Sequence, residues 1–292
     1  MKILNYGSLN VDHVYGVDHF IRPKETMSSN SYNVFLGGKG LNQSIALARA
    51  GANIYHAGKV GKDGDNLVGA LKKSGANTDF ISKTAFESGH TVIQVDSQGQ
   101  NCIILHGGAN QQIKADEIAS VLENFEKGDY LLLQNEINNT ALIMTLAKEK
   151  GLNIVLNPAP MNEKIEALPL ELVDVFVVNE LEGEELTGEK DELKIIEKCL
   201  ERFENSHIIL TLGEKGVYYA DKNQTIFQPA FKVENVLDTT AAGDTFIGYY
   251  LSEKIKGTGT DMCLKIACKA SSICVAKNGA CDSIPHHTEV SL

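Results

Sequence analysis

The sequence predicts an α/β fold with a doubly wound, mostly parallel central sheet, helices on both faces and a small β-sheet lid. Short apolar runs alternate with helical patterns of about 10 to 15 residues, which is typical of parallel strands joined by helices. Right-handed crossovers then place helices on both faces of the sheet. Two segments break this alternation, and no linker rich in Pro, Gly or Ser divides the chain. Residues 1–292 are therefore expected to form a single α/β domain with a lid.

The expected strands of the main sheet are apolar runs too short for helices. They cover residues 2–7, 130–134, 153–157, 174–179 and 207–212. The expected helices show apolar residues at helical spacing over residues 41–50, 66–73, 115–125, 140–150 and 193–203. A further helix is expected near the C-terminal end of the chain, with Asp244 in its first turn and Phe246, Ile247, Tyr250 and Leu251 at helical spacing.

Residues 11–36 and 88–106 are the two segments that interrupt the pattern. The first is polar and mixed, and the second shows two alternating strands around a turn at residues 97–99. A hairpin inserted here does not easily join a buried parallel sheet, so both segments are expected to pair into a lid over one edge of the domain. Because a small sheet with an exposed apolar face tends to aggregate unless it is covered, we expect a homodimer formed through these two segments.

Composition excludes several classes of function. The formal net charge is −11 and no run rich in Lys or Arg offsets it, which argues against a nucleic-acid partner. No apolar run approaches the roughly 20 residues that span a membrane, and the N-terminus resembles a first strand more than a signal peptide. A cytoplasmic protein is expected. The six cysteines contain no CxxC pair, so a zinc site is not expected.

The glycine-rich segment FLGGKGLNQ precedes a helix and suggests a ligand site. Glycines allow a ligand to approach the main chain closely, so Gly38, Lys39 and Asn42 are candidates for binding a polyhydroxylated substrate, the alternative being a simple turn. The segment lacks the Walker A pattern, and no GxGxxG follows the first strand. A P-loop enzyme and a dinucleotide-binding dehydrogenase therefore have no support.

Polar groups also follow other expected strands. Asn10 and Asp12 alternate by two, which suits recognition of vicinal hydroxyls or an Asx turn. Asn179 and Glu182 suit a hydrated Mg²⁺ or the start of an acidic helix. Thr211, Gly213 and Gly216 suit the border of a nucleotide or a tight turn. Because ligands bind beyond the carboxyl ends of parallel strands, we expect these loops to share one rim of the sheet.

The segment DTTAAGDTF leads into the expected C-terminal helix. Its lone carboxylate, Asp244, either stabilises the helix dipole or serves as a catalytic base beside a backbone anion site. The small residues Ala241, Ala242 and Gly243 leave the backbone open to phosphate oxygens. The segment alone does not decide between these two roles.

Over essentially its whole length the sequence resembles the ribokinase-like (PfkB) family of sugar and nucleoside kinases. GGKGLNQ (37–43) and DTTAAGDTF (238–246) carry the resemblance, and GSLNVDH, LHGGAN, NPAP, NELEGEELTG and TLGEKGV follow the family in order and spacing. The resemblance implies an ATP-dependent kinase that phosphorylates the primary hydroxyl of D-ribose. Alternatives are another PfkB substrate, such as 2-deoxyribose, another sugar, adenosine or pseudouridine, and a non-catalytic sugar- or nucleotide-binding regulator.

The resemblance also implies a role for each matching position. Asp244 would be the base, and the backbone of Ala241, Ala242, Gly243 and Asp244 would form the anion hole. The NGACDS segment (278–283) departs from the family pattern in its interior but keeps Gly279 and Ser283. The sugar would contact Asn10, Asp12, Gly38, Lys39, Asn42 and Glu136. Asn179 and Glu182 would support Mg²⁺–ATP through water, and the nucleotide would lie along Thr211, Gly213 and Gly216. A monovalent cation, usually K⁺, would lie near Asp238, Thr240, Cys274, Lys277, Gly279 and Ser283.

Overall fold

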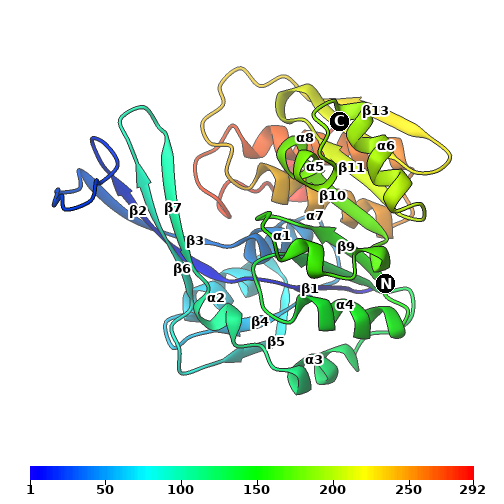
Figure 1. Cartoon of the computed structure of the whole chain (residues 1–292), viewed down its shortest axis with the longest axis horizontal. Helices are drawn as coiled ribbons and strands as arrows, with labels where there is room; N and C mark the ends of the chain where they lie inside the picture. The colour runs from blue at the N-terminus through cyan, green and yellow to red at the C-terminus, as the bar shows by residue number, and fades with distance from the viewer.

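The computed structural model describes residues 1–292 and contains a nine-stranded main sheet and a separate four-stranded sheet (Figure 1). The strand order in the main sheet is β13-β12-β11-β10-β9-β8-β1-β4-β5. The expected fold class is confirmed. The main-sheet strands are β1 (Ile3–Tyr6), β4 (Ile54–Val60), β5 (Asn77–Lys83), β8 (Tyr130–Gln134), β9 (Asn153–Asn157), β10 (Val175–Asn179), β11 (His207–Thr211), β12 (Gly216–Ala220) and β13 (Thr225–Pro229).

All main-sheet pairs from β5 to β11 are parallel, whereas β12 and β13 are antiparallel additions at one edge. Only a short 3₁₀ turn, Gly213–Lys215, joins β11 to β12, and a connection of this length cannot carry a parallel crossover. Strands β4, β5, β12 and β13 were not predicted from the sequence. These strands include Gly, Lys, Gln or alternating polar residues in place of a continuous apolar run.

Two hydrophobic cores lie on opposite faces of the main sheet. Neighbouring residues of β1 point to opposite faces, so Ile3 belongs to one core and Leu4 to the other. The first core includes residues of α1 (Lys39–Arg49), α2 (Asp65–Ser74), α7 (Ala242–Ile255) and α8 (Thr260–Cys274). The second includes residues of α3 (Ala115–Leu122), α4 (Thr140–Glu149), α5 (Glu180–Thr187) and α6 (Glu192–Arg202). None of these helices has the length and hydropathy needed to cross a bilayer.

Helix α7 is buried around most of its circumference, from Asp244 to Ser252. Cys263, Cys268, Cys274 and Cys281 lie in the same core as α7. Burial raises the pKa of Cys268 to about 12, so its thiol stays protonated and acts as a small apolar group. These four cysteines are therefore core residues.

The two segments that interrupt the α/β alternation form the second sheet, referred to below as the small sheet. Its strands are β2 (Asn10–Gly16), β3 (Ser31–Gly37), β6 (Gly89–Val95) and β7 (Asn101–His106), in the order β3-β2-β6-β7. The strands β6 and β7 form the expected hairpin. Figure 1 shows this sheet extending away from the main sheet on one side of the molecule. The prediction of a small separate sheet is confirmed.

Helices α1 and α7 approach each other closely at a glycine. A Cβ atom added at Gly248 would lie 2.8 Å from the backbone nitrogen of Leu47 and would also overlap Ala46. This close approach brings the first turns of the two helices together. Both turns carry residues of the expected site.

We expect Gly248→Ala to lower the free energy of unfolding by about 1–3 kcal/mol, the usual cost of overpacking. Urea denaturation monitored by circular dichroism measures this change. Gly69→Ala is the matched control, because Gly69 lies in α2 with no atom within 4 Å of the added Cβ. The control is expected to stabilise the protein by up to about 1 kcal/mol. Equal effects at the two sites would contradict the assigned helix contact.

Candidate active site

A cleft of about 460 Å³ lies at the carboxyl ends of β9, β10 and β11, facing the N-terminus of α7. This is the rim where open α/β sheets bind their ligands. Residues from both halves of the sequence meet there. Those of the predicted site that line the cleft are Lys39, Asn179, Glu182, Thr211, Gly213, Ala241, Gly243 and Asp244.

The N-terminus of α7 has an open backbone. No side chain caps it, and Ala241 precedes the helix at φ 62°, a left-handed conformation that is unusual for alanine. The amide of Ala242 donates to the carbonyl oxygen of Thr239 at 3.2 Å, so this expected anion-hole donor is engaged. Gly243 and Asp244 follow within the first turn, where helix geometry leaves N–H groups without intrahelical partners. Small residues on both sides keep this turn accessible.

The carboxylate of Asp244 is 8% exposed and is held by two amides from α1. Asn42 Nδ2 donates to Oδ2 at 3.0 Å, and Gln43 Nε2 donates to Oδ1 at 2.9 Å. Asn42 Oδ1 is buried and has no hydrogen-bond partner. A ligand hydroxyl could satisfy it, because a buried amide oxygen normally accepts at least one hydrogen bond.

One lysine lies among several carboxylates beside the glycine-rich turn. Burial lowers the pKa of Lys39, but attraction to Asp244, Glu136 and Glu182 outweighs it, and the pKa is raised overall. The Glu136 carboxylate accepts from the Lys39 amide at 2.9 Å and from the Ser8 hydroxyl. Burial raises the pKa of Glu136 despite these bonds and the nearby Lys39 charge. The site therefore contains more carboxyl groups than cationic side chains.

Asn10 and Asp12 lie in strand β2, where the small sheet leaves the main domain. The Asx-turn interpretation is therefore wrong. Asn110 Nδ2 donates to Asn10 Oδ1 at 2.7 Å, and the Thr91 hydroxyl donates to Asp12 Oδ1 at 2.6 Å. Burial raises the pKa of Asp12. The polar partners hold both side chains in fixed positions.

Asn179 and Glu182 form a capping box at the start of α5. Asn179 Oδ1 accepts from the Glu182 amide at 2.8 Å, and Glu182 Oε2 accepts from the Asn179 amide at 3.0 Å. Burial also raises the pKa of Glu182. The helix-start interpretation thus holds, and both residues also line the cleft.

The residues expected near a monovalent cation form a second cluster. Asp238 accepts from the amides of Thr240 and Gly279, at 2.8 and 3.1 Å. Cys274 Sγ lies 3.0 Å from Ser283 Oγ and 3.7 Å from the Thr240 carbonyl oxygen. Lys277 is different: its ammonium pairs with Glu289 at 2.6 Å, so its side chain is committed to a surface ion pair.

Other buried groups of the site did not emerge from the sequence analysis. Ser8, Thr91 and Asn110 contact the predicted sugar-binding residues, and Gln43 contacts Asp244. Gln43 belongs to the motif GGKGLNQ, but the sequence pattern contains no information on how close it lies to Asp244. Gly216, at φ 134°, begins β12 and is absent from the cleft lining.

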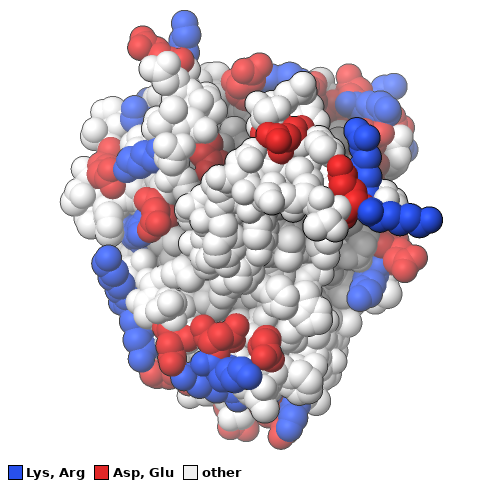
Figure 2. All heavy atoms as spheres, turned by 90° about the vertical axis from the view of Figure 1, so that its left-hand side faces the viewer, with Lys and Arg blue, Asp and Glu red and all other residues white.

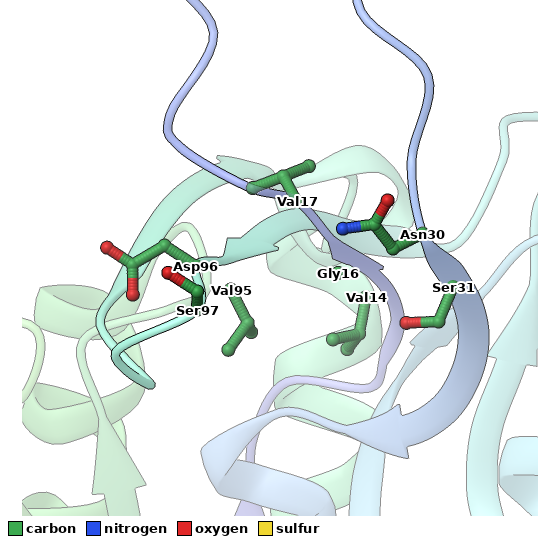
Figure 3. Close-up of a pocket in the computed structure, with 8 residues that line it drawn as sticks. All are labelled: Val14, Gly16, Val17, Asn30, Ser31, Val95, Asp96 and Ser97. Atoms are coloured by element: carbon green, nitrogen blue, oxygen red, sulfur yellow. The ribbon is translucent and has the colours of Figure 1, made fainter.

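A second hollow of about 380 Å³ lies at the end of the small sheet (Figure 3). Val14 and Val95 line it, along with Asn30, Ser31 and Ser97. Asp96 is its only charged residue. The hollow contains none of the predicted site residues, so it is separate from the cleft.

Comparisons with known proteins agree with the resemblance stated above. The profile of the pfkB family carbohydrate kinases matches residues 1–287. The ribokinase of Staphylococcus aureus is 37% identical over 99% of this chain and 98% of its own, and the deoxyribokinase of Salmonella typhimurium is 30% identical over 98% and 96%. The structure of Arabidopsis thaliana ribokinase complexed with ribose and ATP matches with a TM-score of 0.87 at 28% identity, over 99% and 96% of the chains.

We expect Lys39→Met to lower the free energy of unfolding by about 2 kcal/mol at pH 8, less than a fully buried pair would cost because Lys39 is half-buried. Without this lysine, the already raised pKa values of Glu136 and Glu182 rise further. The folded state then gains protons before the unfolded state, so the deficit shrinks as the pH falls towards 5. Urea denaturation at both pH values measures it.

Lys62→Met is the control, because Lys62 is 73% exposed in its ion pair with Glu87. It should change the stability by less than about 0.5 kcal/mol at either pH. A deficit in Lys39→Met that is the same at pH 8 and pH 5 would contradict the assigned charge balance.

Proposed function

We propose that this chain, which belongs to the pfkB family of carbohydrate kinases, transfers the γ-phosphoryl group of ATP to the primary hydroxyl of D-ribose. The observation that carries the proposal is the position of Asp244. Its buried carboxylate stands beside the open N-terminus of α7, at the edge of a cleft on the ligand-binding rim. A base and an anion site are thus adjacent.

Asp244 is proposed to orient the attacking hydroxyl and to accept its proton. The hydroxyl oxygen forms the bond to the γ-phosphorus while the bond from phosphorus to the leaving ADP oxygen breaks. The proton passes to the carboxylate, and the products are ribose 5-phosphate and ADP. Two amide donors already fix the orientation of this carboxylate, which saves reorganisation during the reaction.

The first turn of α7 is proposed to stabilise the transferring phosphoryl group. Oriented N–H groups at a helix N-terminus bind anions and require no rearrangement. The amides of Gly243 and Asp244 suit this role best, and Ala241 supplies the turn that exposes them. Ala242 can contribute if its amide leaves the Thr239 carbonyl.

The sugar is proposed to lie between the small sheet and the first turn of α1. Asn10, Asp12 and Glu136 offer oxygen acceptors to its hydroxyl groups, and Lys39 offers a charge that balances them. Gly38, at φ 93°, allows close approach of the main chain. Asn42 Oδ1 has no protein partner and is free to accept from a hydroxyl.

The nucleotide is proposed to occupy the cleft along Thr211 and Gly213, with Gly216 holding the turn behind them. No group of three or more His, Cys, Asp or Glu residues is arranged to hold a metal ion. Glu182 and Asn179 are committed to the capping box, which fits contacts to Mg²⁺ through water. Mg²⁺ bound to ATP would neutralise phosphate charge, and these two residues would orient its water ligands.

Asp238, Thr240, Gly279 and Ser283 are proposed to surround a monovalent cation such as K⁺. Their carboxylate, carbonyl and hydroxyl oxygens suit a hard cation, and Cys274 closes the cluster with a softer thiol. The Lys277 ammonium is turned towards Glu289, so only its main chain could contribute. K⁺ here would support the loop that leads into α7.

Ribose is preferred over other acceptors because two relatives with near-complete coverage are ribokinases, one of them solved with ribose and ATP. Asp12 supports this choice, since a carboxylate among the sugar ligands suits a sugar with a 2-hydroxyl. A deoxy sugar would leave that carboxylate without its hydroxyl partner. The use of ATP is consistent with a cytoplasmic location.

We further propose that the small sheet is a lid and that two lids pair to form a homodimer. Tyr32, Val34 and Ile104 are each at least half exposed, which is unusual for large apolar residues of a stable monomer. Figure 2 shows the side of the molecule where the small sheet lies, with a broad central area free of charged side chains. Pairing would cover this surface and the exposed edges of the sheet.

The first experiment measures ADP release from Mg²⁺–ATP with D-ribose, 2-deoxyribose, fructose, adenosine and pseudouridine, each in K⁺ and in Na⁺. The fastest turnover is expected on ribose in K⁺. Asp244→Asn should lose about 10³-fold or more in kcat, because its amide cannot accept the proton, while ribose binding is roughly kept. Faster turnover on another acceptor would contradict ribose as the substrate and assign that acceptor in its place. Near-normal turnover in Asp244→Asn would exclude Asp244 as the base.

Light scattering at micromolar concentration is expected to give twice the chain mass of 31.7 kDa. Ile103 and Ile104 are neighbours in β7 and point to opposite faces of the small sheet. Only one of Ile103→Glu and Ile104→Glu should therefore produce a monomer, and the result identifies the interface. A wild-type mass of 31.7 kDa would refute the dimer.

A further inference from the structure

We propose that Gln43 is a positioning residue for the catalytic base: its amide holds Oδ1 of Asp244 so that Oδ2 receives the proton of the sugar hydroxyl. The proposal rests on the proposed function, because it assigns a task to the carboxylate of that reaction. Gln43 would act through Asp244 and would not contact the ligand itself. Gln43 is fully buried, with 0% of its surface exposed.

The two residues that donate hydrogen bonds to Asp244 differ in how deeply they are buried. Asn42 is 5% exposed and its own oxygen has no partner, so its bond to Oδ2 lies nearer the molecular surface than the Gln43 bond. Gln43 lies on the core side and donates to Oδ1 at 2.9 Å. A sugar hydroxyl can share or displace the Asn42 contact. The Gln43 contact stays in place, because no ligand can reach it.

A chain of buried amides fixes the orientation of Gln43. Asn5 Nδ2 donates to the backbone carbonyl of Gly40 at 2.8 Å, which leaves Asn5 Oδ1 as an acceptor. Gln134 Nε2 donates to that oxygen at 3.0 Å and to Gln43 Oε1 at 2.6 Å. Since Gln43 Oε1 is thereby an acceptor, its Nε2 must be the atom that faces Asp244.

A backbone carbonyl, which can only accept, therefore sets the direction of every bond up to the catalytic carboxylate. Gln43 Nε2 also donates to Asn157 Oδ1 at 3.2 Å, at the end of β9. Rotation of the Gln43 amide would place its oxygen against the Asp244 and Asn157 oxygens and lose these bonds. The amide is locked, so Asp244 meets the same donor in each catalytic cycle.

The simpler interpretation is that Gln43 only satisfies its own buried amide. Such a role predicts a loss of stability on substitution and nothing more. A positioning role predicts a loss in kcat with little change in KM for the sugar, because Gln43 is remote from the sugar ligands of the small sheet.

The test compares Gln43→Met with the wild-type chain, using the acceptor that gives turnover. Met keeps the volume and removes the donor. We expect kcat to fall about 10- to 100-fold through misplacement of the base, with KM changed less than about threefold.

Ser252→Ala is the matched control. Ser252 is fully buried on the same helix as Asp244 and donates to the Ala50 carbonyl at 3.0 Å, far from the carboxylate. It should lose stability without a change in kcat. Should Gln43→Met fail to fold, Gln134→Met keeps Gln43 and removes the donor that locks its amide. A smaller fall in kcat in the same direction is then expected.

A ¹³C NMR spectrum of the carboxyl groups at neutral pH separates this proposal from the proposed function. Asp244→Asn identifies the signal of Asp244, and Gln43→Met should change the chemical shift of that signal whether or not ribose is the substrate, whereas Ser252→Ala should leave it unchanged. An unchanged chemical shift in Gln43→Met together with wild-type kcat would overturn the positioning role. Wild-type protein that turns over no acceptor, combined with a changed chemical shift in Gln43→Met, would overturn only the proposed function.

Discussion

The site depends on the close contact between the first turns of α1 and α7. These helices lie about 200 residues apart in the sequence, yet Gly248 lets their backbones approach until Asn42 and Gln43 reach Asp244. A helix N-terminus offers its open amides on one side of this contact, and the glycine-rich turn proposed to bind the sugar lies on the other. The buried carboxylate between them would be costly without its two donors. The helix packing, the hydrogen bonds to Asp244 and the open amides of α7 therefore all depend on this one contact.

The charged groups around that contact suit the binding of a ligand better than the stability of the folded protein without one. Glu136 and Glu182 are half-buried carboxylates whose pKa values are raised by partial burial, and Lys39 is the nearby cation that balances them. Hydroxyl groups of the proposed sugar substrate would supply hydrogen bonds to these acids, and the proposed Mg²⁺ would add positive charge at the nucleotide end. The protein without ligands therefore holds groups that the proposed substrates would satisfy, which is typical of functional sites.

The sequence was most informative where a pattern has a single physical cause. Continuous apolar runs predicted the first and the last residue of both β8 and β9 correctly, because strands buried on both faces need apolar side chains throughout. Strands β4, β5, β12 and β13 were missed, since Gly58, Lys59 and the alternating residues of β13 resemble loop or surface composition. Lys59 is buried and pairs with Glu117 of α3 at 2.7 Å, a contact that no local pattern reveals.

The sequence by itself determined the fold class, the separate small sheet and the motifs GGKGLNQ and DTTAAGDTF, because periodicity, turn residues and helix starts are local properties of a chain. The tertiary structure alone decided which members of these motifs touch. It placed Gln43 on Asp244, turned Lys277 towards Glu289 and engaged the amide of Ala242 with Thr239. Contacts of this kind depend on the distances between elements far apart in sequence, which are fixed only when both faces of the sheet are packed.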